Sequence, residues 1–348
     1  MWVSPLCGNI AACNFFQPDI MMNHPDPHPL EQEIQQTATG VPFATTLNLA
    51  SLEISGADAR TFLHNQFTSD VKSLQVGQAQ LSAWCTAKGR MIANFILYPV
   101  SDDVFHLLLP LELLPGFIKR LQMYVLRSRV KLTSLSVAQD AADAQGQLGL
   151  SGANAADALT ALNLPVPKTP LSVATLNETS IIRLPDGRFI LFAPQKSLRD
   201  FREQLSTQIQ PASQAVWEWL DIQAALPWIT RATSEAFVPQ MMDFEKMGGV
   251  SFTKGCYPGQ EIVARSQYLG QVKRHLYRLA SQQPLMSGED LHSPASPDQA
   301  AGKVITAAAP DPTGNYAALA VVLDAAAADL RQGGNDGASV QATPVYSG

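Results

Sequence analysis

One short segment contains residue types that could do chemistry. Residues 248–265 read GGVSFTKGCYPGQEIVAR, so a single thiol, Cys256, lies within a glycine-rich stretch and two residues after Lys254. Gly255 and Gly259 bracket a Cys-Tyr-Pro tripeptide, which predicts a tight loop with a defined backbone path. A helix is predicted to begin just after this loop, over residues 260–265.

The predicted loop favours a reactive thiol at Cys256. The nearby Lys254 and the N-terminus of the following helix would both stabilise the thiolate. Such a thiol could act as a nucleophile, as a transient metal or sulfur ligand, or as a redox group, and the sequence does not choose among these roles. The alternative is structural, because a lone cysteine is more often a small buried apolar residue.

The remaining cysteines do not form a second site. Cys7, Cys13 and Cys85 are scattered, and the chain has no CxxC pair and no Cys/His cluster with zinc spacing. A disulfide framework is not expected with four cysteines in 348 residues, so we predict a cytoplasmic protein without a structural metal site. An iron–sulfur cluster of its own, which usually takes about four thiolates, is not expected either.

Composition limits the possible partners. The chain is 46% hydrophobic and 16% charged, with a formal net charge of -6, which is typical of a globular protein of two or three domains. Strong direct binding of nucleic acid is not expected, because proteins with that function are usually basic. The apolar runs are of strand length and far below the roughly 20 residues that cross a bilayer, so no membrane span is predicted.

A similarity between two segments of the chain predicts the strands and helices that must position the loop. Residues 52–63 and 148–159 each read as a short strand, a Ser-Gly turn and a helix. Each copy is followed by apolar strands and a second helix, which is close to a ferredoxin-like plan. The alternative is a chance similarity of two strand–helix starts. The later strands and helices are predicted at 81–85, 91–98, 104–109, 117–125, 180–184, 189–192 and 198–209.

The two ends of the chain differ from these halves. Residues 1–42 predict a disordered leader, and the absence of Lys and Arg from residues 1–20 argues against a signal peptide. Translation from Met21 or Met22 is an alternative start. Beyond the α+β region at 43–283, Pro- and Ser-rich residues precede short strands, so 284–348 predict a small β-barrel.

The loop and several other motifs resemble one known family. The eight residues KGCYPGQE resemble the signature of the YgfZ family, folate-binding relatives of the glycine-cleavage T-protein. The resemblance covers about residues 43–346. Its signature residues here are Lys254, Gly255, Cys256, Tyr257, Gly259, Gln260 and Glu261, and its further matches are Phe62–Val71, Ala87–Arg90, Phe237–Gln240, Gly248–Gly249, Val263–Arg265 and Gly270.

This resemblance implies a fold and a function. The fold would be α+β, with two interleaved ferredoxin-like halves around a folate cavity and a small C-terminal β-barrel. The function would be that of an accessory factor that binds tetrahydrofolate, or a one-carbon derivative of it. Such a factor supports the assembly or repair of iron–sulfur enzymes, including those that thiolate tRNA. Its partners would be iron–sulfur proteins or their assembly machinery, and its function would depend on Cys256.

The same resemblance implies folate contacts. Trp217 aligns with a family tryptophan that meets the pterin, and flat aromatic rings stack well on such a ring system. The alternative is that Trp217 or Trp219 simply fills the core. Some relatives carry a second tryptophan where this chain has Leu49, which would line the pocket differently. Arg231 and Arg265 are candidates for carboxylate recognition, because Arg can grip a carboxylate with two hydrogen bonds.

Basic residues also gather between 119 and 131. They would meet the glutamate tail of folate or an acidic partner, or they would form a solvated surface of a helix and a strand edge. The residues are Lys119, Arg120, Arg127, Arg129 and Lys131.

Two rival functions remain open at the level of sequence. The first is a folate-dependent aminomethyltransferase or demethylase, so enzyme activity is uncertain. T-proteins carry an acidic residue that faces the reacting folate nitrogen, whereas the matching strand here, Met91–Phe95, has no carboxylate to move a proton. The second is an interaction scaffold with a relict pocket, which predicts no folate affinity and full function for Cys256→Ala.

Overall fold

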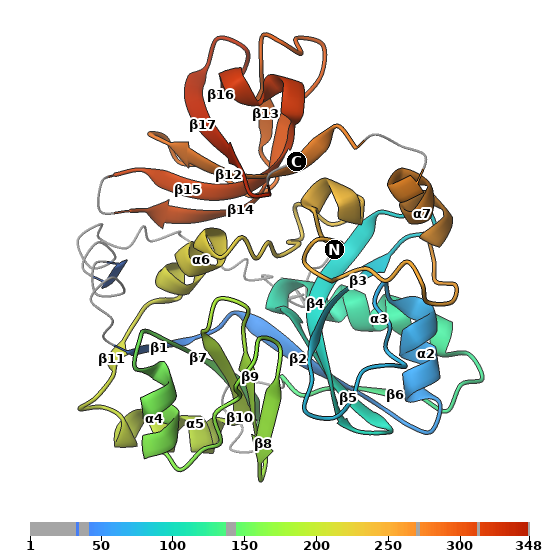
Figure 1. Cartoon of the computed structure of the whole chain (residues 1–348), viewed down its shortest axis with the longest axis vertical. Helices are drawn as coiled ribbons and strands as arrows, with labels where there is room; N and C mark the ends of the chain where they lie inside the picture. Colours follow the sequence, from blue (N-terminus) through green and yellow to red (C-terminus); the bar gives the residue numbers. More distant parts are fainter. Residues whose placement is uncertain (1–32, 35–41, 137–143, 269–271, 312–313, 347–348) are drawn as a thin grey trace, which may run out of the picture.

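The molecule consists of two β-sheets side by side, a β-barrel above them and a helix between the barrel and the sheets (Figure 1). The computed structural model describes residues 33–34, 42–136, 144–268, 272–311 and 314–346. The leader predicted at 1–42 therefore lies almost wholly outside the described residues. Within them, the helices are too short or too polar to cross a membrane.

The first sheet carries two helices on one face. Its order is β3-β4-β5-β2-β6, and α2 and α3 pack around Phe67, Phe95 and Phe117. Strand β4 is a near-continuous apolar run because both of its faces are buried: Phe95 points toward these helices and Tyr98 toward the centre of the molecule. The elements are β2 (Leu49–Ser55), α2 (Ala59–Gln66), β3 (Gln80–Cys85), β4 (Met91–Ser101), β5 (Val104–Pro110), α3 (Leu114–Val125) and β6 (Lys131–Ser134).

The second sheet repeats this plan and takes in the first strand of the chain. Its order is β11-β1-β7-β10-β9-β8, so β1 lies between two strands that follow it by about a hundred residues or more. The elements are β1 (Phe43–Thr46), β7 (Gln145–Ser151), α4 (Ala155–Ala161), β8 (Val173–Leu176), β9 (Thr179–Arg183), β10 (Phe189–Pro194), α5 (Gln195–Gln204) and β11 (Gln210–Pro211).

The two similar segments of the sequence, residues 52–63 and 148–159, form equivalent strands and helices in the two halves. In each half a strand leads through a Ser-Gly turn into a helix, and Gly56 and Gly152 both have positive φ, at 129° and 105°. The strands predicted after each copy are present. The helix predicted over 198–209 is wrong at its end: α5 stops at Gln204, and Leu205 and Ile209 reach the apolar cluster from turns instead.

The C-terminal part is a closed antiparallel barrel that begins before residue 284. Strand β12 pairs with β15 and β17, so the Pro- and Ser-rich stretch connects two barrel strands instead of preceding the barrel. The barrel was predicted to begin at residue 284 because turn residues mark the ends of strands, but they do not show to which domain a strand belongs. The strands are β12 (Arg274–Ser281), β13 (Asp290–His292), β14 (Gly302–Pro310), β15 (Tyr316–Leu323), β16 (Leu330–Gln332) and β17 (Ala338–Pro344).

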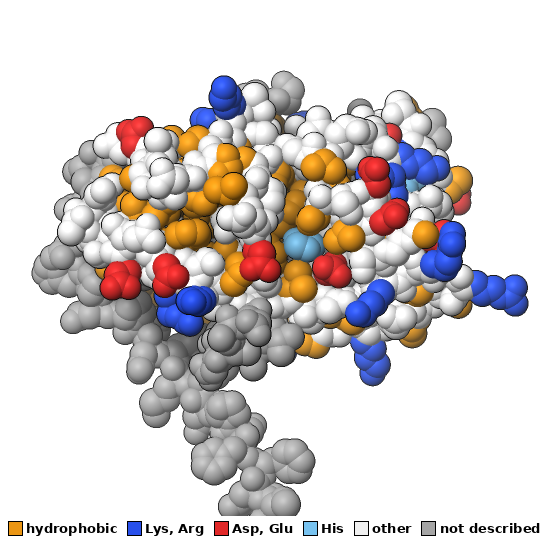
Figure 2. Space-filling model, turned by 90° about the horizontal axis from the view of Figure 1, so that it is seen from below, with side chains coloured by type: hydrophobic (Ala, Val, Ile, Leu, Met, Phe, Trp, Pro, Cys, Tyr) orange, Lys and Arg blue, Asp and Glu red, His pale blue; other side chains and the backbone are white. Residues whose placement is uncertain are grey.

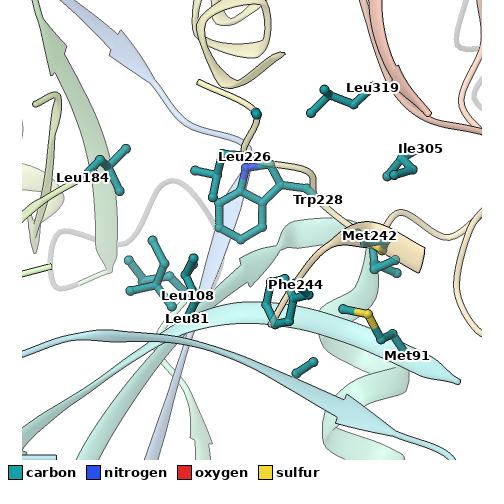
Figure 3. Packing of buried hydrophobic residues seen from close by; sticks show 14 of the residues in the cluster. Leu81, Met91, Leu108, Leu184, Leu226, Trp228, Met242, Phe244, Ile305 and Leu319 are labelled. Carbon is teal, nitrogen blue, oxygen red and sulfur yellow. The ribbon is translucent and has the colours of Figure 1, made fainter. Parts of the chain in front are cut away.

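One apolar core joins the three parts. Figure 3 shows Leu81 and Leu108 from the first sheet, Leu184 from beside the second sheet and Leu319 from the barrel around the ring of Trp228. These side chains fill the centre where the sheets and the barrel meet.

Candidate functional site

The signature loop presents a free thiol at the surface. Cys256 is exposed and unpaired, whereas Cys85 is buried, and burial raises the pKa of the Cys85 thiol to about 12. The interpretation of Cys256 as a buried apolar residue is therefore wrong, and Cys85 is the cysteine of that kind. Helix α7 (Gln260–Tyr268) begins at Gln260, as the sequence predicts.

Lys254 fastens the loop to the end of a helix. Its ammonium is buried and donates hydrogen bonds to the carbonyl oxygens of His64 and Phe67, where α2 ends. A cation at this position also complements the negative end of the helix dipole. The same ammonium lies 4.9 Å from the ring centroid of Tyr257. Lys254 therefore holds the loop against the end of α2, two residues before the thiol.

This burial predicts a particular pH dependence. Burial lowers the pKa of Lys254 from 10.5 to about 8. Between pH 8 and 10.5 the unfolded chain then binds more protons than the folded one, so the contribution of Lys254 to the free energy of unfolding rises with pH. We expect wild type to gain stability relative to Lys254→Met across this range, measured by urea unfolding at matched pH values. A constant difference between the two proteins would show that the ammonium is not desolvated.

Gly259 brings two separate motifs into contact. A Cβ on Gly259 would lie 2.3 Å from the carbonyl oxygen of Thr86 and 2.7 Å from the Cα of Gly89, and its φ is +82°. Gly89 in turn lies against Ile262 at the start of α7. The turn between β3 and β4 and the signature loop therefore pack backbone to backbone, which a side chain at residue 259 would prevent.

Thr68 fixes the upstream side of the loop. Its hydroxyl donates to the Gly249 carbonyl at 2.6 Å and accepts from the Ala83 amide at 2.9 Å. Its own carbonyl accepts from the Ser251 amide at 2.9 Å. The motifs that resemble the family at 62–71, 87–90 and 248–261 are thus brought together around one loop, although up to about 190 residues separate them.

The other signature residues divide into buried and exposed ones. Tyr257 is 6% exposed, and its hydroxyl has no hydrogen-bond partner among the described residues. Burial raises the pKa of this phenol. Gly255 lies beside the His64 ring, with a Cβ position 3.8 Å from Nε2. Gln260 is half-buried and Glu261 is exposed, both in the first turn of α7.

Trp217 lines a cavity elsewhere, between the sheets, α6 (Gln214–Gln223) and the barrel. The cavity has a volume of about 200 Å³. Leu49 lines it too, so the two positions that the resemblance assigns to the pterin pocket do meet there. The other lining residues are Leu47, Asn48, Pro110, Glu112, Gln214, Glu218, Asp221, Trp228, Thr230, Ser287, Thr306 and Ala307.

Neither Asp221 nor Trp228 was predicted from the sequence to lie at this cavity. Asp221 lies one helical turn after Trp217, and the spacing i, i+4 on one helix could have indicated a shared face. Trp228 carries no such signal, because it follows the helix in an irregular segment whose path only the tertiary structure defines.

The two predicted arginines are apart. Arg231 is exposed beside the cavity: its amide donates to Glu112 Oε1 at 2.8 Å and its guanidinium to the Glu112 carbonyl at 3.2 Å. Arg265 is exposed on α7 and does not line the Trp217 cavity. Arg231 therefore lies next to two residues of the cavity, Glu112 and Thr230, although neither arginine is among the residues that line it.

The basic residues between 119 and 131 do not line this cavity either. Arg120 pairs with Glu235 at 2.6 Å, and Arg129 pairs with Asp58 at 3.3 Å. Lys119, Arg127 and Lys131 are exposed. On the face seen from below, Lys and Arg side chains gather toward the side of the first sheet (Figure 2). The surface position favours a solvated face or a partner over a role in the cavity.

Asn94 occupies the strand in which a T-protein would carry its acidic residue. Its side chain is fully buried, and its amide group donates to the Pro227 carbonyl at 2.8 Å and accepts from the Ile229 amide at 2.7 Å. Both ends of the amide are therefore used to hold the segment around Trp228. Among the described residues, no cluster of three or more His, Cys, Asp or Glu side chains could hold a metal ion.

Comparisons with known proteins agree with this architecture. The family described as the GCVT N-terminal domain matches residues 10–215. The "tRNA-modifying protein YgfZ" of Yersinia pseudotuberculosis is 33% identical over 73% of this chain and 76% of its own length. The protein of the same name from Colwellia psychrerythraea is 33% identical over 69% of this chain and 72% of its own length.

A solved structure matches most of the fold. The glycine cleavage system aminomethyltransferase T from Bartonella henselae aligns with a TM-score of 0.74 at 17% identity, over 91% of this chain and 88% of its own. The fold is thus the mixed α+β fold of aminomethyltransferase T with a six-stranded antiparallel barrel at its C-terminus. The match to the family over residues 10–215 and the two relatives show that the chain belongs to the GCVT N-terminal domain family and, within it, groups with the YgfZ proteins.

Proposed function

We propose that this protein is a cytoplasmic, tetrahydrofolate-binding accessory factor that supports iron–sulfur enzymes, including those that thiolate tRNA, through the thiol of Cys256. The observation that carries the proposal is the signature loop. Its cysteine is exposed while Lys254, Tyr257 and Gly259 are held against α2 and the β3–β4 turn. A thiol on a rigid, exposed loop suits chemistry on a partner protein better than a role in the core.

The division of the chain is part of the proposal. Residues 43–273 would form the folate-binding region, in which two interleaved ferredoxin-like halves leave a cavity at their junction, and the barrel, whose first strand is β12, would close one side of it. The placement of β1 within the second sheet supports the interleaving. The strand orders of the two sheets support the ferredoxin-like plan.

The Trp217 cavity fits part of a folate. Its volume of about 200 Å³ is below the roughly 300–1,000 Å³ typical of small-molecule sites, so it would enclose a two-ring head group and leave the tail outside. Trp217 and Trp228 supply aromatic rings, and Glu218 supplies a carboxylate that can accept from ring N–H groups. Arg231 at the rim would meet a carboxylate of the tail. Bound folate would supply a one-carbon unit or reducing equivalents.

A genetic experiment tests the function. The gene is deleted in its host, and methylthiolated tRNA nucleosides are quantified by mass spectrometry with and without a restored wild-type copy. We expect the deletion to lower these nucleosides and the wild-type copy to restore them. Unchanged nucleosides after deletion would overturn the proposed role and favour the scaffold or the transferase.

A binding experiment tests the pocket. Trp217→Ala is expected to weaken tetrahydrofolate binding by roughly 1–3 kcal/mol, because a buried aromatic anchor that stacks on the pterin is lost. Isothermal titration calorimetry measures the change. Trp219→Ala is the control, because Trp219 lies two residues away on the same helix and does not line the cavity. Equal affinity of Trp217→Ala and wild type would contradict the proposed pterin position.

The aminomethyltransferase alternative finds less support. Asn94 has no carboxylate, and its amide is occupied by the backbone around Trp228. A side chain so engaged cannot exchange a proton with a bound folate. Turnover of a methylene-donor substrate by the purified protein would restore the alternative.

A further inference from the structure

A second cavity lies between the barrel and the part of the chain before β12, here called the body. Its volume is about 240 Å³, and it shares no lining residue with the Trp217 cavity. Each wall carries cationic and apolar side chains. The body wall includes Arg90, Phe237 and Met241, and the barrel wall includes Arg274, Lys303 and Val321.

Two arginines are held at these walls by main-chain carbonyl groups. Arg90 Nη1 donates to the Ala236 carbonyl at 2.5 Å. Arg274 donates from Nη2 to the Ala300 carbonyl at 2.7 Å and from Nη1 to the Ala301 carbonyl at 3.1 Å. Because Ala236 and Ala300 line the cavity themselves, both guanidinium groups lie at its walls. The bonds orient the two groups and leave their other N–H donors without a protein partner among the described residues.

The positive charge of these two arginines is not compensated. Within the described part of the chain, neither Arg90 nor Arg274 pairs with a carboxylate, since their hydrogen bonds go to carbonyl oxygens. Asp290 is the one acidic residue of the lining, and its Oδ1 lies 2.5 Å from Lys303 Nζ. That pair is neutral as a unit, so the cavity keeps two net positive charges, one on each wall.

A neighbouring hollow extends this basic region between α7 and the barrel. Its volume is about 360 Å³, and it shares Met241 and Arg274 with the first cavity. It adds the exposed Lys273 and no acidic residue. Val238 and Leu323 also line it, so apolar side chains separate the basic groups. A ligand held by Arg274 would therefore find apolar contacts beside a positive charge.

This combination of groups fits a phosphate on a small organic body. An arginine fork recognises phosphate oxygens with two hydrogen bonds, and a phosphomonoester carries about −1.5 to −2 charges, which matches two uncompensated arginines on two walls. The volume is below the roughly 300–1,000 Å³ of typical small-molecule sites, so the organic body would be small. We propose that this cavity binds a small phosphomonoester, with its phosphate between Arg90 and Arg274 and its apolar part against Phe237 and Met241.

The proposed site adjoins the support of the signature loop. Arg90 follows Gly89, and the backbone of Gly89 packs against Gly259. A phosphomonoester that bridges Arg90 and Arg274 would therefore link the barrel to the β3–β4 turn on which the loop rests. The inference does not depend on folate binding, because the Trp217 cavity is formed by other residues.

The test removes the two charges and compares matched probes. The main variant is Arg90→Met/Arg274→Met, and Arg90→Met alone, at an exposed position, is the second variant in case the double variant does not melt cooperatively. Arg278→Met is the matched control: Arg278 also lies on β12 and donates to two carbonyl oxygens, those of Ile222 and Gln223 at 3.2 and 2.7 Å, but does not line the cavity. The probes are phenyl phosphate, benzoate and a short RNA without terminal phosphates, titrated by calorimetry at low salt.

We expect wild type and Arg278→Met to bind phenyl phosphate, and to bind benzoate at least about ten-fold more weakly, because a carboxylate occupies only one arginine fork. The double variant should lose at least about ten-fold in affinity for phenyl phosphate, since it loses hydrogen bonds to a charged group on both walls. Arg90→Met and Arg90→Lys should each lose part of this affinity, because an ammonium does not replace the planar fork.

Three results would overturn the proposal or part of it. Absence of phenyl phosphate binding to wild type, or unchanged affinity in the folded variants that lack Arg90, overturns the site. Equal affinity for benzoate and phenyl phosphate overturns the assignment of a phosphate. Tighter binding of the RNA than of phenyl phosphate, with the same loss in the double variant, overturns the small-molecule ligand and assigns the two arginines to a nucleic-acid contact. Each result leaves the test of folate binding by Trp217→Ala unaffected.

Discussion

Cys256→Ala is expected to abolish the restoration of methylthiolated tRNA nucleosides in the deletion strain, while the variant protein accumulates to wild-type levels. The side chain is exposed, and surface substitutions of this kind usually change the free energy of unfolding by about 0.5 kcal/mol or less. Loss of function without loss of protein would then report on the thiol itself. The measurement combines nucleoside mass spectrometry with immunoblotting of the variant.

Cys85→Ala is the matched control for this experiment. It removes the other described cysteine, which is buried against the same loop region at the end of β3. Deleting a buried group leaves a small cavity, so this variant should be less stable and yet restore the nucleosides wherever it accumulates. Full restoration by Cys256→Ala would contradict the proposed role of the thiol and favour a scaffold.

Gly259→Ala is expected to separate the signature loop from the β3–β4 turn and to destabilise the protein strongly. The backbone at residue 259 has a φ of +82°, where an L-residue costs roughly 1–2 kcal/mol. The new Cβ would also meet the Thr86 carbonyl at 2.3 Å and the Gly89 backbone at 2.7 Å. Overpacking against backbone typically costs about 1–3 kcal/mol more, because a main chain cannot rotate away. Urea unfolding measures the sum.

Gly248→Ala separates the two costs. Gly248 has a φ of +77° and no atom within 4 Å of its Cβ position, so its substitution carries the backbone cost without the clash. We expect Gly259→Ala to be clearly less stable than Gly248→Ala and to alter the rate at which iodoacetamide alkylates Cys256. Equal stability of the two variants would show that the loop and the turn do not pack as closely as described.

The sequence predicted the local elements well where they have a clear period. The apolar run of β4, the strand β15 and the start of α7 at Gln260 follow from alternation, length and flanking glycines. The repeated strand–turn–helix units are equally local, since each Ser-Gly turn has its glycine at positive φ. The prediction failed at the end of α5, which stops five residues before the predicted end although Leu205 and Ile209 continue the helical spacing of its apolar residues.

The signature loop shows how far sequence reasoning reaches in the candidate site. Its residues, its glycines and the helix after it could be identified from the sequence alone. The exposure of Cys256 could not, because residue type favours burial of a lone cysteine. The role of Lys254 at the end of α2 could not either, since the two partners of its ammonium precede it by nearly 190 residues.

The sequence by itself thus determined the secondary elements and the chemically distinctive loop, because propensity, periodicity and turn residues act over a few neighbouring residues. The tertiary structure alone decided three other features. It placed β1 in the sheet of the second half and β12 in the barrel, and it brought Arg188, Asp221 and Trp228 together behind Trp217. These features depend on pairing between segments that are far apart in the sequence. Such pairing is decided by how the surfaces of strands and helices pack together, and no short sequence pattern indicates it.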